Sequence, residues 1–219
     1  MSDGIHSIGE LVTDPLFPEL DLALRKGRHV CEDDVAFYSL LDAARPLFQD
    51  FYGAYGWDLI YRSDIGVYYL LPRDDSLGRT HLSGHAMVVG QAALLLYLDS
   101  TETTRSAGRV TREQLLDVLV TVLGEEGVAT RLLGRSDRRE TRQVELVHQR
   151  IGGALRELST LGFVDTSSSG EVRLLPPLMR FADAVADREG NWRARLVQLA
   201  ATGEVIVDDM DAPSGEGEE

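Results

Sequence analysis

The stretch that decides the fold is ALRELSTLGFVDTSSSGEVRLLPP, residues 154–177. It continues a helical pattern in which apolar residues recur every three or four positions. The expected buried face of this helix is Val144, Val147, Ile151, Leu155 and Leu158. Residues 163–165 and 171–175 then alternate like strands, and the polar residues 166–170 between them form the expected turn. An amphipathic helix therefore leads directly into a small β-hairpin.

The same order of elements occurs earlier in the chain. Asp33 and Asp34 suit the start of a helix, and Pro46 should divide the following apolar pattern into two helices. Residues 57–62 and 67–71 alternate as the strands of a hairpin. A helix that packs on so small a hairpin is typical of a winged helix. We therefore predict a mainly α fold with small β-hairpins (α+β), arranged as two tandem winged-helix domains.

The domain limits follow from the polar residues between these units. A long helix is expected from about residue 83 to 99, and the polar stretch 100–109 should be the linker. Thr111 with Gln114 three residues later predicts a capped helix start. Two more helices are expected over residues 177–187 and 192–201. We predict an N-terminal domain over 1–105, a C-terminal domain over 106–203 and a disordered acidic tail over 204–219.

The composition limits what the protein can do. The chain has 219 residues, 43% of them hydrophobic, and a net charge of −14. Such a charge repels phosphate, so any contact with DNA requires a local basic patch. Cys31 is the single cysteine, which fits a reducing cytoplasm. No signal peptide is expected, and the longest apolar stretch, residues 86–98, is too short and mixed to span a membrane.

No arrangement of residues typical of catalysis is present. The sequence has no phosphate-binding GxxxxGK[ST] loop, no GxSxG and no HExxH. His81 and His85 have the spacing of helical metal ligands but no third ligand, so two exposed histidines are the favoured interpretation. Acidic neighbours disfavour a reactive thiolate at Cys31. We therefore predict that the protein is not an enzyme and has no catalytic residue, metal site or cofactor.

Positive charge collects in one segment. Residues 128–156 hold seven arginines against three acidic residues, a local charge of +4 in an acidic chain. Arginine is well suited to phosphate. The alternative is a solvated helix face with internal ion pairs. The residues that we predict to contact DNA phosphate are Arg131, Arg135, Arg138, Arg139, Arg142, Arg150 and Arg156.

The corresponding part of the first domain has the opposite charge. Residues 33–56 hold four aspartates and Arg45 alone, a local charge of −3. This segment and its surroundings are instead rich in Phe, Tyr and Trp. Most of these rings should belong to the core, and any that reach the surface would suit a protein interface.

Several stretches resemble the MukE family, the winged-helix (kite) subunit of the bacterial MukBEF condensin. The strongest is DPLFPELDLALRKGRHV, residues 14–30. The resemblance continues in FQDFYGAYGWDLIYR (48–62), VYYLLPR (67–73) and LLLYLDSTE (94–102). It extends through ALRELSTLGFV, VRLLPPLMRF and LVQLAATGE to the acidic tail, so that it covers nearly the whole chain from about Gly9.

The resemblance implies a homodimer that holds the kleisin MukF, joins the SMC ATPase MukB and helps to clamp DNA in chromosome condensation and segregation. It implies a cytoplasmic, nucleoid-associated protein without catalytic activity or membrane attachment. This chain departs from the family at Gly152, Ser159 and Thr160, where more basic residues are expected. The residues expected at the kleisin or dimer interface are Phe17, Leu20, Leu24, Arg28, Phe48, Tyr52 and Tyr55.

Two other functions compete with a condensin subunit. A dimeric winged-helix transcription regulator would need a basic wing and a basic recognition helix. The expected wing tip, residues 167–171, is neutral to acidic, which argues against a sequence-specific DNA reader. An enzyme would need a site that the sequence does not contain.

Overall fold

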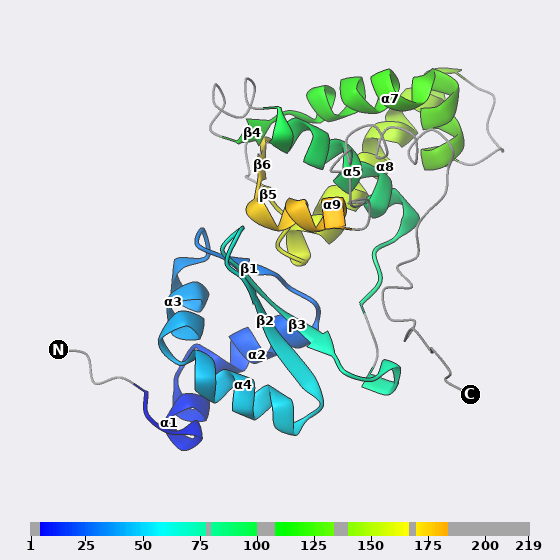
Figure 1. The fold of residues 1–219 in the computed structure, drawn as a ribbon. Coiled ribbons are helices and arrows are strands. Elements are labelled where there is room, and N and C mark those ends of the chain that lie inside the picture. Colours follow the sequence, from blue (N-terminus) through cyan, green and yellow to red (C-terminus); the bar gives the residue numbers. More distant parts are fainter. Residues whose placement is uncertain (1–4, 78–79, 100–107, 134–139, 167–169, 184–219) are drawn as a thin grey trace, which may run out of the picture.

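The polypeptide forms two lobes that meet along one junction (Figure 1). The structure is a computed structural model, and it describes residues 5–77, 80–99, 108–133, 140–166 and 170–183. Small antiparallel sheets accompany the helices, so the predicted mainly α, α+β class is confirmed.

The first lobe consists of four helices and a three-stranded sheet. Pro46 stands in the first turn of the fourth helix, so the predicted division into two helices is confirmed. The elements, in chain order, are α1 (Ile8–Thr13), α2 (Phe17–Arg25), β1 (Val30–Cys31), α3 (Val35–Ala43), α4 (Arg45–Ala54), β2 (Trp57–Arg62), β3 (Val67–Pro72) and the 3-10 turn η1 (Asp75–Leu77).

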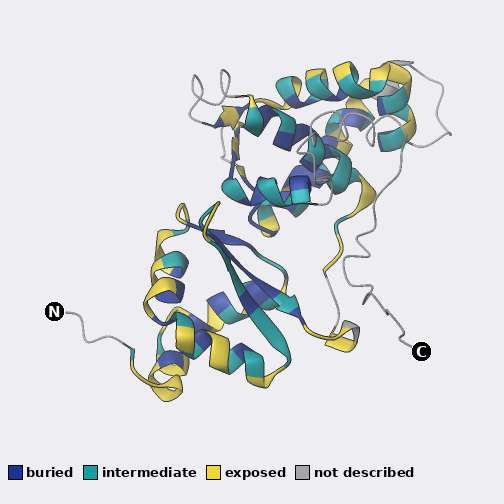
Figure 2. Cartoon of the chain, viewed as in Figure 1, coloured by how far each residue is buried: buried dark blue, intermediate teal, exposed yellow. Residues whose placement is uncertain are grey.

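The sheet of the first lobe has the order β1-β3-β2, with every pair antiparallel. The predicted hairpin is present, and Leu59 pairs with Leu70 across it. The short strand β1, which the sequence did not reveal, adds to its free edge by pairing Val30 with Tyr68. Figure 2 shows the buried sides of the surrounding helices turned toward this sheet.

The second lobe repeats this order on a larger scale. Its elements are α5 (Gly84–Leu98), β4 (Arg109–Val110), α7 (Arg112–Leu133), α8 (Glu140–Thr160), β5 (Val164–Thr166), β6 (Val172–Leu174), η2 (Pro176–Met179) and α9 (Arg180–Asp183). The sheet order is β4-β6-β5, again antiparallel. Thr111 and Gln114 form the predicted capping box, because each side chain accepts the backbone N–H of the other.

Helix α5 packs in the second lobe and not in the first. Its buried face, which includes Val89 and Leu94, lies in one apolar cluster with α7 and α8. The cluster of the first lobe ends at Leu70. The division between the two cores therefore falls before α5, whereas we had expected a boundary at residues 105/106. The expected linker lies almost wholly outside the described residues.

Three other expectations need correction or lie outside the described residues. Val144 is 59% exposed, because the packed face of α8 begins only at Val147. Helix α7 continues to Leu133 through a break at Gly124, so the basic segment begins inside a helix. After the second hairpin, η2 and α9 replace the start of the expected helix 177–187. The expected helix over residues 192–201 and the acidic tail are not among the described residues.

The lobes meet where β1 and β3 face the elements around the second hairpin. Cys31, Val67 and Tyr69 of the first lobe form a small buried cluster with Leu175 of the second. The backbone N–H of His29 donates to the carbonyl oxygen of Leu161 at 2.9 Å. This apolar cluster and backbone hydrogen bond join the two lobes.

Candidate interaction surfaces

Most of the predicted interface residues of the first lobe form its core. Phe17, Leu20, Leu24, Phe48 and Tyr52 are between 0% and 7% exposed. A partner cannot reach them while the lobe is folded, and we correct the expectation for these five. Their spacing in the sequence reflects packing: the Phe17 and Phe48 rings, for example, stack with centroids 5.9 Å apart.

Two of the predicted interface residues do reach the surface. The side chain of Arg28 is 36% exposed and forms a 2.8 Å ion pair with Asp34. Tyr55, which follows the last turn of α4, is 57% exposed. An interface on this lobe can therefore use these two side chains directly.

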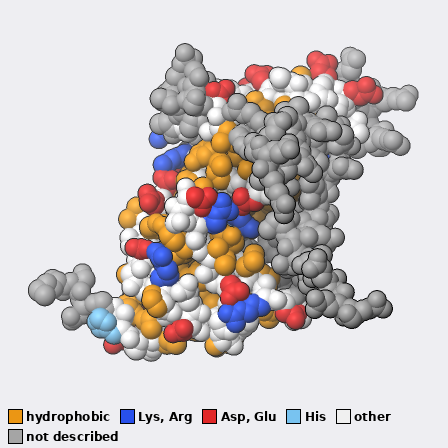
Figure 3. All heavy atoms as spheres, in the orientation of Figure 1, with side chains coloured by type: hydrophobic (Ala, Val, Ile, Leu, Met, Phe, Trp, Pro, Cys, Tyr) orange, Lys and Arg blue, Asp and Glu red, His pale blue; other side chains and the backbone are white. Residues whose placement is uncertain are grey.

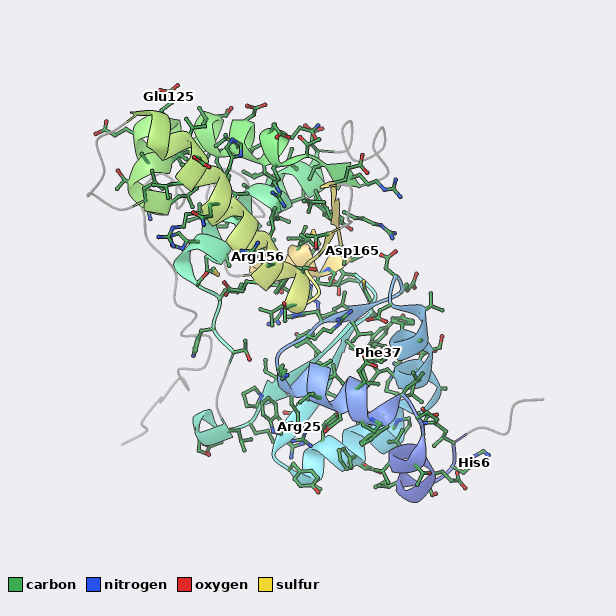
Figure 4. The ribbon with its side chains drawn as sticks, turned by 180° about the vertical axis from the view of Figure 1, so that it is seen from behind. His6, Arg25, Phe37, Glu125, Arg156 and Asp165 are labelled. Carbon is green, nitrogen blue, oxygen red and sulfur yellow. The ribbon has the colours of Figure 1, made fainter. Side chains whose placement is uncertain are left out.

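Arg25 brings the exposed Tyr55 ring next to helix α2. Its guanidinium carbon lies 5.2 Å from the centroid of Tyr55 and 5.5 Å from that of Tyr52, while its Nε pairs with Asp21 at 2.8 Å. Figure 4 shows Arg25 between α2 and α4. A cation over an aromatic face is attracted by the ring quadrupole. The sequence did not point to Arg25, because its aromatic partners come from another helix.

Exposed apolar side chains accompany Tyr55 along α1 and α2. Ile8 and Val12 are four residues apart on α1, and Leu22 shares a face of α2 with Arg25. Their exposed fractions are between 37% and 57%. The members of what we call the first-lobe apolar surface are Ile8, Val12, Leu16, Leu22 and Tyr55.

In a second aromatic cluster of the first lobe, the tyrosine hydroxyls have hydrogen-bond partners within the lobe. The hydroxyl of Tyr68 donates to Asp42 at 2.9 Å, and the guanidinium of Arg45 lies 4.2 Å from the Tyr61 ring centroid while it pairs with Asp42. The hydroxyls of Tyr38 and Tyr61 lie 3.2 Å apart. This hydrogen bond, together with desolvation, raises the pKa of Tyr38 to about 12. A pair of tyrosine hydroxyls that are hydrogen-bonded to each other indicates a structural role.

The face seen in Figure 3 mixes the two signs of charge with apolar side chains over the first lobe. Arg73 pairs with Asp58 on the hairpin at 2.7 Å. Arg62 pairs with Asp64 at 2.7 Å. Basic side chains with such acidic neighbours have little net charge to offer a phosphate, in agreement with the negative balance of this lobe.

The predicted arginines of the second lobe are only partly described. Arg150 and Arg156 are exposed on α8, and Arg131 is half-buried near the end of α7. Arg135, Arg138 and Arg139 lie outside the described residues, as does the side chain of Arg142. Figure 4, from behind, shows Arg156 on α8.

Two glycines of α8 lie beside two guanidinium groups. A Cβ placed on Gly152 would lie 3.9 Å from a terminal nitrogen of Arg112, and one on Gly153 would lie 3.9 Å from a terminal nitrogen of Arg156. Helix α8 is continuous here, and both distances are ordinary van der Waals contacts, so the glycines mark neither a break nor an unusually close approach. Arg112, which sequence reasoning missed, thus joins Arg150 and Arg156. We call these three the second-lobe arginine surface.

Among the residues that the structure describes, no group of three or more His, Cys, Asp or Glu side chains could hold a metal ion. Within the same ranges, none of the helices has the length and apolar character needed to cross a membrane. Burial raises the pKa of the Cys31 thiol, which is 3% exposed. A buried, protonated thiol is a poor nucleophile.

The exposed apolar side chains of the first lobe and the arginines of the second are candidate contact surfaces, and comparison with known proteins shows the family. The model of the family described as condensin complex protein MksE matches residues 15–186. The chain belongs to this family.

Individual relatives carry the name that the sequence stretches suggested. The chain is 32% identical to the chromosome partition protein MukE of Vibrio cholerae over 204 residues, which cover 92% of this chain and 87% of the relative. It is 31% identical to MukE of Photobacterium profundum over 204 residues, 92% of this chain and 85% of that protein. It is also 32% identical to MukE of Escherichia coli O6:H1 over 177 residues, 80% and 77% of the two chains. The resemblance to MukE is confirmed.

Proposed function

We propose that the chain is a non-catalytic accessory subunit of a MukBEF-type SMC condensin. In this role it binds a MukF-like kleisin as a homodimer, joins a MukB-like SMC ATPase and contributes to clamping DNA during chromosome condensation and segregation. It would act in the cytoplasm, at the nucleoid. The observation that carries the proposal is the match to the condensin family over residues 15–186.

We propose further that each lobe is a winged helix. In both lobes a helix is followed by a short strand, two helices and a hairpin. In both, the short strand pairs with the second strand of the hairpin, in the orders β1-β3-β2 and β4-β6-β5. This repeated connection, more than the helix content, supports two tandem winged-helix domains.

The first-lobe apolar surface is the proposed contact for the kleisin. Its five side chains are exposed on a well-packed lobe, whereas the deeper rings of the same helices are buried. A tyrosine that a partner buries contributes more to affinity than the polar rim around it. The contact of the Arg25 guanidinium with the Tyr55 ring holds this side chain in place before the partner binds.

The test is a pull-down of the full chain co-expressed with the kleisin, followed by titration of the purified proteins. Leu22→Asp and Tyr55→Asp, made separately, should each weaken kleisin binding by about tenfold or more, because a charge would be buried in an apolar contact. Val35→Asp is the matched control, since Val35 is 70% exposed on α3, outside the surface.

The outcomes separate the surface from the function. If Val35→Asp weakens binding as much as Leu22→Asp, the contact lies elsewhere on the lobe. If the unmodified chain and the kleisin elute as two separate species at micromolar concentration, the proposed function itself is wrong.

DNA contact is proposed for the second-lobe arginine surface and the neighbouring predicted arginines. Arg150 and Arg156 are exposed on one helix, in the segment with a local charge of +4. With a net charge of −14, the free chain should bind DNA weakly and without sequence preference, and the assembled complex should bind more tightly.

A dimeric transcription regulator is less well supported. The β5–β6 wing carries Asp165 and Glu171 next to Arg173, and that arginine is paired with Asp33 of the first lobe. Because this arginine is already ion-paired, the wing has little positive charge with which to contact a DNA groove. A promoter fragment recovered with the chain in place of a kleisin would favour this alternative.

A further inference from the structure

His29 occupies the centre of the junction between the lobes. It follows α2 in the first lobe and is 7% exposed, although it is a titratable residue. Its Nδ1 lies 3.1 Å from the carbonyl oxygen of Leu161, in the turn between α8 and β5. Because the backbone N–H of His29 donates to the same oxygen, that single carbonyl accepts two hydrogen bonds from one residue of the opposite lobe.

The other ring nitrogen fixes the protonation state of the imidazole. Nε2 lies 2.6 Å from a terminal nitrogen of Arg180 on α9. A guanidinium can only donate, so Nε2 must accept. A carbonyl oxygen can only accept, so Nδ1 must carry the proton. One neutral tautomer satisfies both contacts, and a doubly protonated ring would lose the contact with Arg180.

Aromatic rings close the site on both sides. The ring of His29 lies 5.4 Å from that of Tyr69 on β3 and 4.5 Å from that of Phe163 at the start of the second hairpin. Arg180 covers Tyr69 at 4.0 Å, and Phe163 contacts Phe181 edge to face at 5.1 Å. These rings exclude water and connect the sheet of the first lobe with α9 of the second.

The backbone of the turn that contacts His29 is sterically constrained at Gly162. Gly162 has a φ of +77°, in the left-handed region that favours glycine. A Cβ at this position would lie 2.2 Å from the carbonyl oxygen of His29. The backbones of the two lobes are therefore in direct contact at this point.

We propose that His29 is an uncharged latch: the two lobes keep one relative orientation while its imidazole is neutral, and a proton on the ring releases them. Within the described ranges, two ion pairs also cross the junction, Arg62 with Asp183 and Arg173 with Asp33. Both are partly exposed, and exposed pairs contribute little to stability. The latch would couple the orientations of the two lobes. A partner that rotates one lobe must rotate the other with it or break the contacts of His29.

The groups around the ring determine the direction of the pH effect. Among the residues that the structure describes, the titratable or charged side chains that face His29 are Arg180 from α9 and Tyr69 from β3, whereas the α8–β5 turn contributes Leu161, Gly162 and Phe163. Burial, and then the charge of Arg180, lowers the pKa of His29 from 6.5 to about 3. The closed junction therefore binds fewer protons than the open one. It is fully stable above about pH 6.5, and its opening constant rises about tenfold for each pH unit below that value.

The orientation of the lobes can be measured in the full chain with a pair of spin labels. Asp50→Cys on α4 and Glu145→Cys on α8 place one label on an exposed position of each lobe, and Cys31 is buried. At pH 7.5 the distance distribution should be narrow. His29→Lys should broaden it, because a permanent cation then faces Arg180. His29→Gln should keep it narrow between pH 7.5 and 5, because the amide oxygen can still accept from Arg180 and does not titrate. His81→Gln, at an exposed position, is the control.

A second measurement needs no destabilising variant. In histidine-labelled protein, the ring signals of His29 should stay those of the neutral Nδ1–H tautomer down to pH 5. His29→Gln assigns the signal. The latch is refuted if the His29 ring becomes doubly protonated between pH 7.5 and 5 while the lobes keep one orientation, or if His29→Lys folds and keeps the narrow distance distribution. If His29→Lys does not fold, the ring signals of the unmodified protein decide.

Discussion

The helix that precedes the hairpin differs between the two lobes. In the first lobe it is α4, ten residues long, which buries Phe48 and Tyr52 and exposes Gln49 and Asp50. In the second it is α8, 21 residues long, with exposed arginines. The connection and the sheet order are the same. One topology therefore presents different side chains in the two lobes, and the function of each lobe has to be inferred from them.

The helices also differ in how they begin. Ser83 and Thr111 cap α5 and α7 of the second lobe with side-chain hydrogen bonds. In the first lobe Ser7 caps α1, whereas α3 and α4 begin without a side-chain cap. These short helices rely on tightly packed rings, whereas the second lobe adds capping to its packing. Substitutions at matched positions should reveal this difference.

The largest effect is expected at the junction, from Gly162→Ala. The change adds the strain of a left-handed alanine to a backbone clash with His29, and should cost about 3 kcal/mol or more of unfolding free energy. Urea denaturation of the full chain measures it.

Gly170→Ala is the matched control for this prediction. Gly170 has a φ of +86°, but a Cβ there would meet no atom within 4 Å. It should cost only the strain of the backbone, about 1 kcal/mol. Equal losses for the two variants would show that the contact between the lobes adds nothing to stability.

The next effect concerns DNA. Arg150→Glu with Arg156→Glu should weaken DNA binding by the assembled complex about tenfold or more and lower the salt slope by about two. Fluorescence anisotropy with a short duplex at two salt concentrations measures both.

Lys26→Glu with Arg73→Glu changes the net charge by the same amount on the first lobe, where both residues are exposed. This control should leave DNA binding nearly unchanged. If both double variants weaken DNA binding equally, binding depends on the total charge of the chain. The difference in surface residues between the lobes would then have no effect on DNA binding.

The smallest effect is expected at the start of α7. Thr111→Ala removes a side-chain cap and should destabilise the chain by about 1 kcal/mol in thermal or urea unfolding. Thr121→Ala, at an exposed position in the same helix, should be close to neutral because alanine suits a helix interior. A neutral Thr111→Ala would show that capping does not distinguish the lobes.

The sequence predicted the elements with strong local signals. The helix break at Pro46, the capping box at Thr111 and the hairpin of residues 57–72 all depend on near neighbours in the chain. The edge strands β1 and β4 are two residues long and exist only because a distant strand pairs with them. The place of α5 was missed for the same reason: an apolar helix between two cores carries no local sign of which core it joins.

The surface predictions show a similar limit. Aromatic residues indicated a protein interface, yet of the predicted contacts Phe48, Tyr52 and Tyr55 the first two are core residues and Tyr55 is exposed. The spacing of apolar residues in the sequence cannot distinguish an aromatic ring in the core from an exposed ring that binds a partner. Arg112 escaped notice because it lies outside the basic segment and meets α8 only in the folded lobe. No local pattern indicated the role of His29, since its hydrogen-bond partners Leu161 and Arg180 are more than 130 residues away in the chain.

Gly90 of α5 illustrates how the junction should constrain sequence change. A Cβ there would lie 2.3 Å from the ring of Phe181, the residue that follows Arg180. That ring contacts Phe163, which contacts His29. Among related chains, we therefore expect a larger residue at position 90 to occur together with a smaller one at 181. Positions 29, 90, 162 and 181, scattered through the chain, should then change as a group.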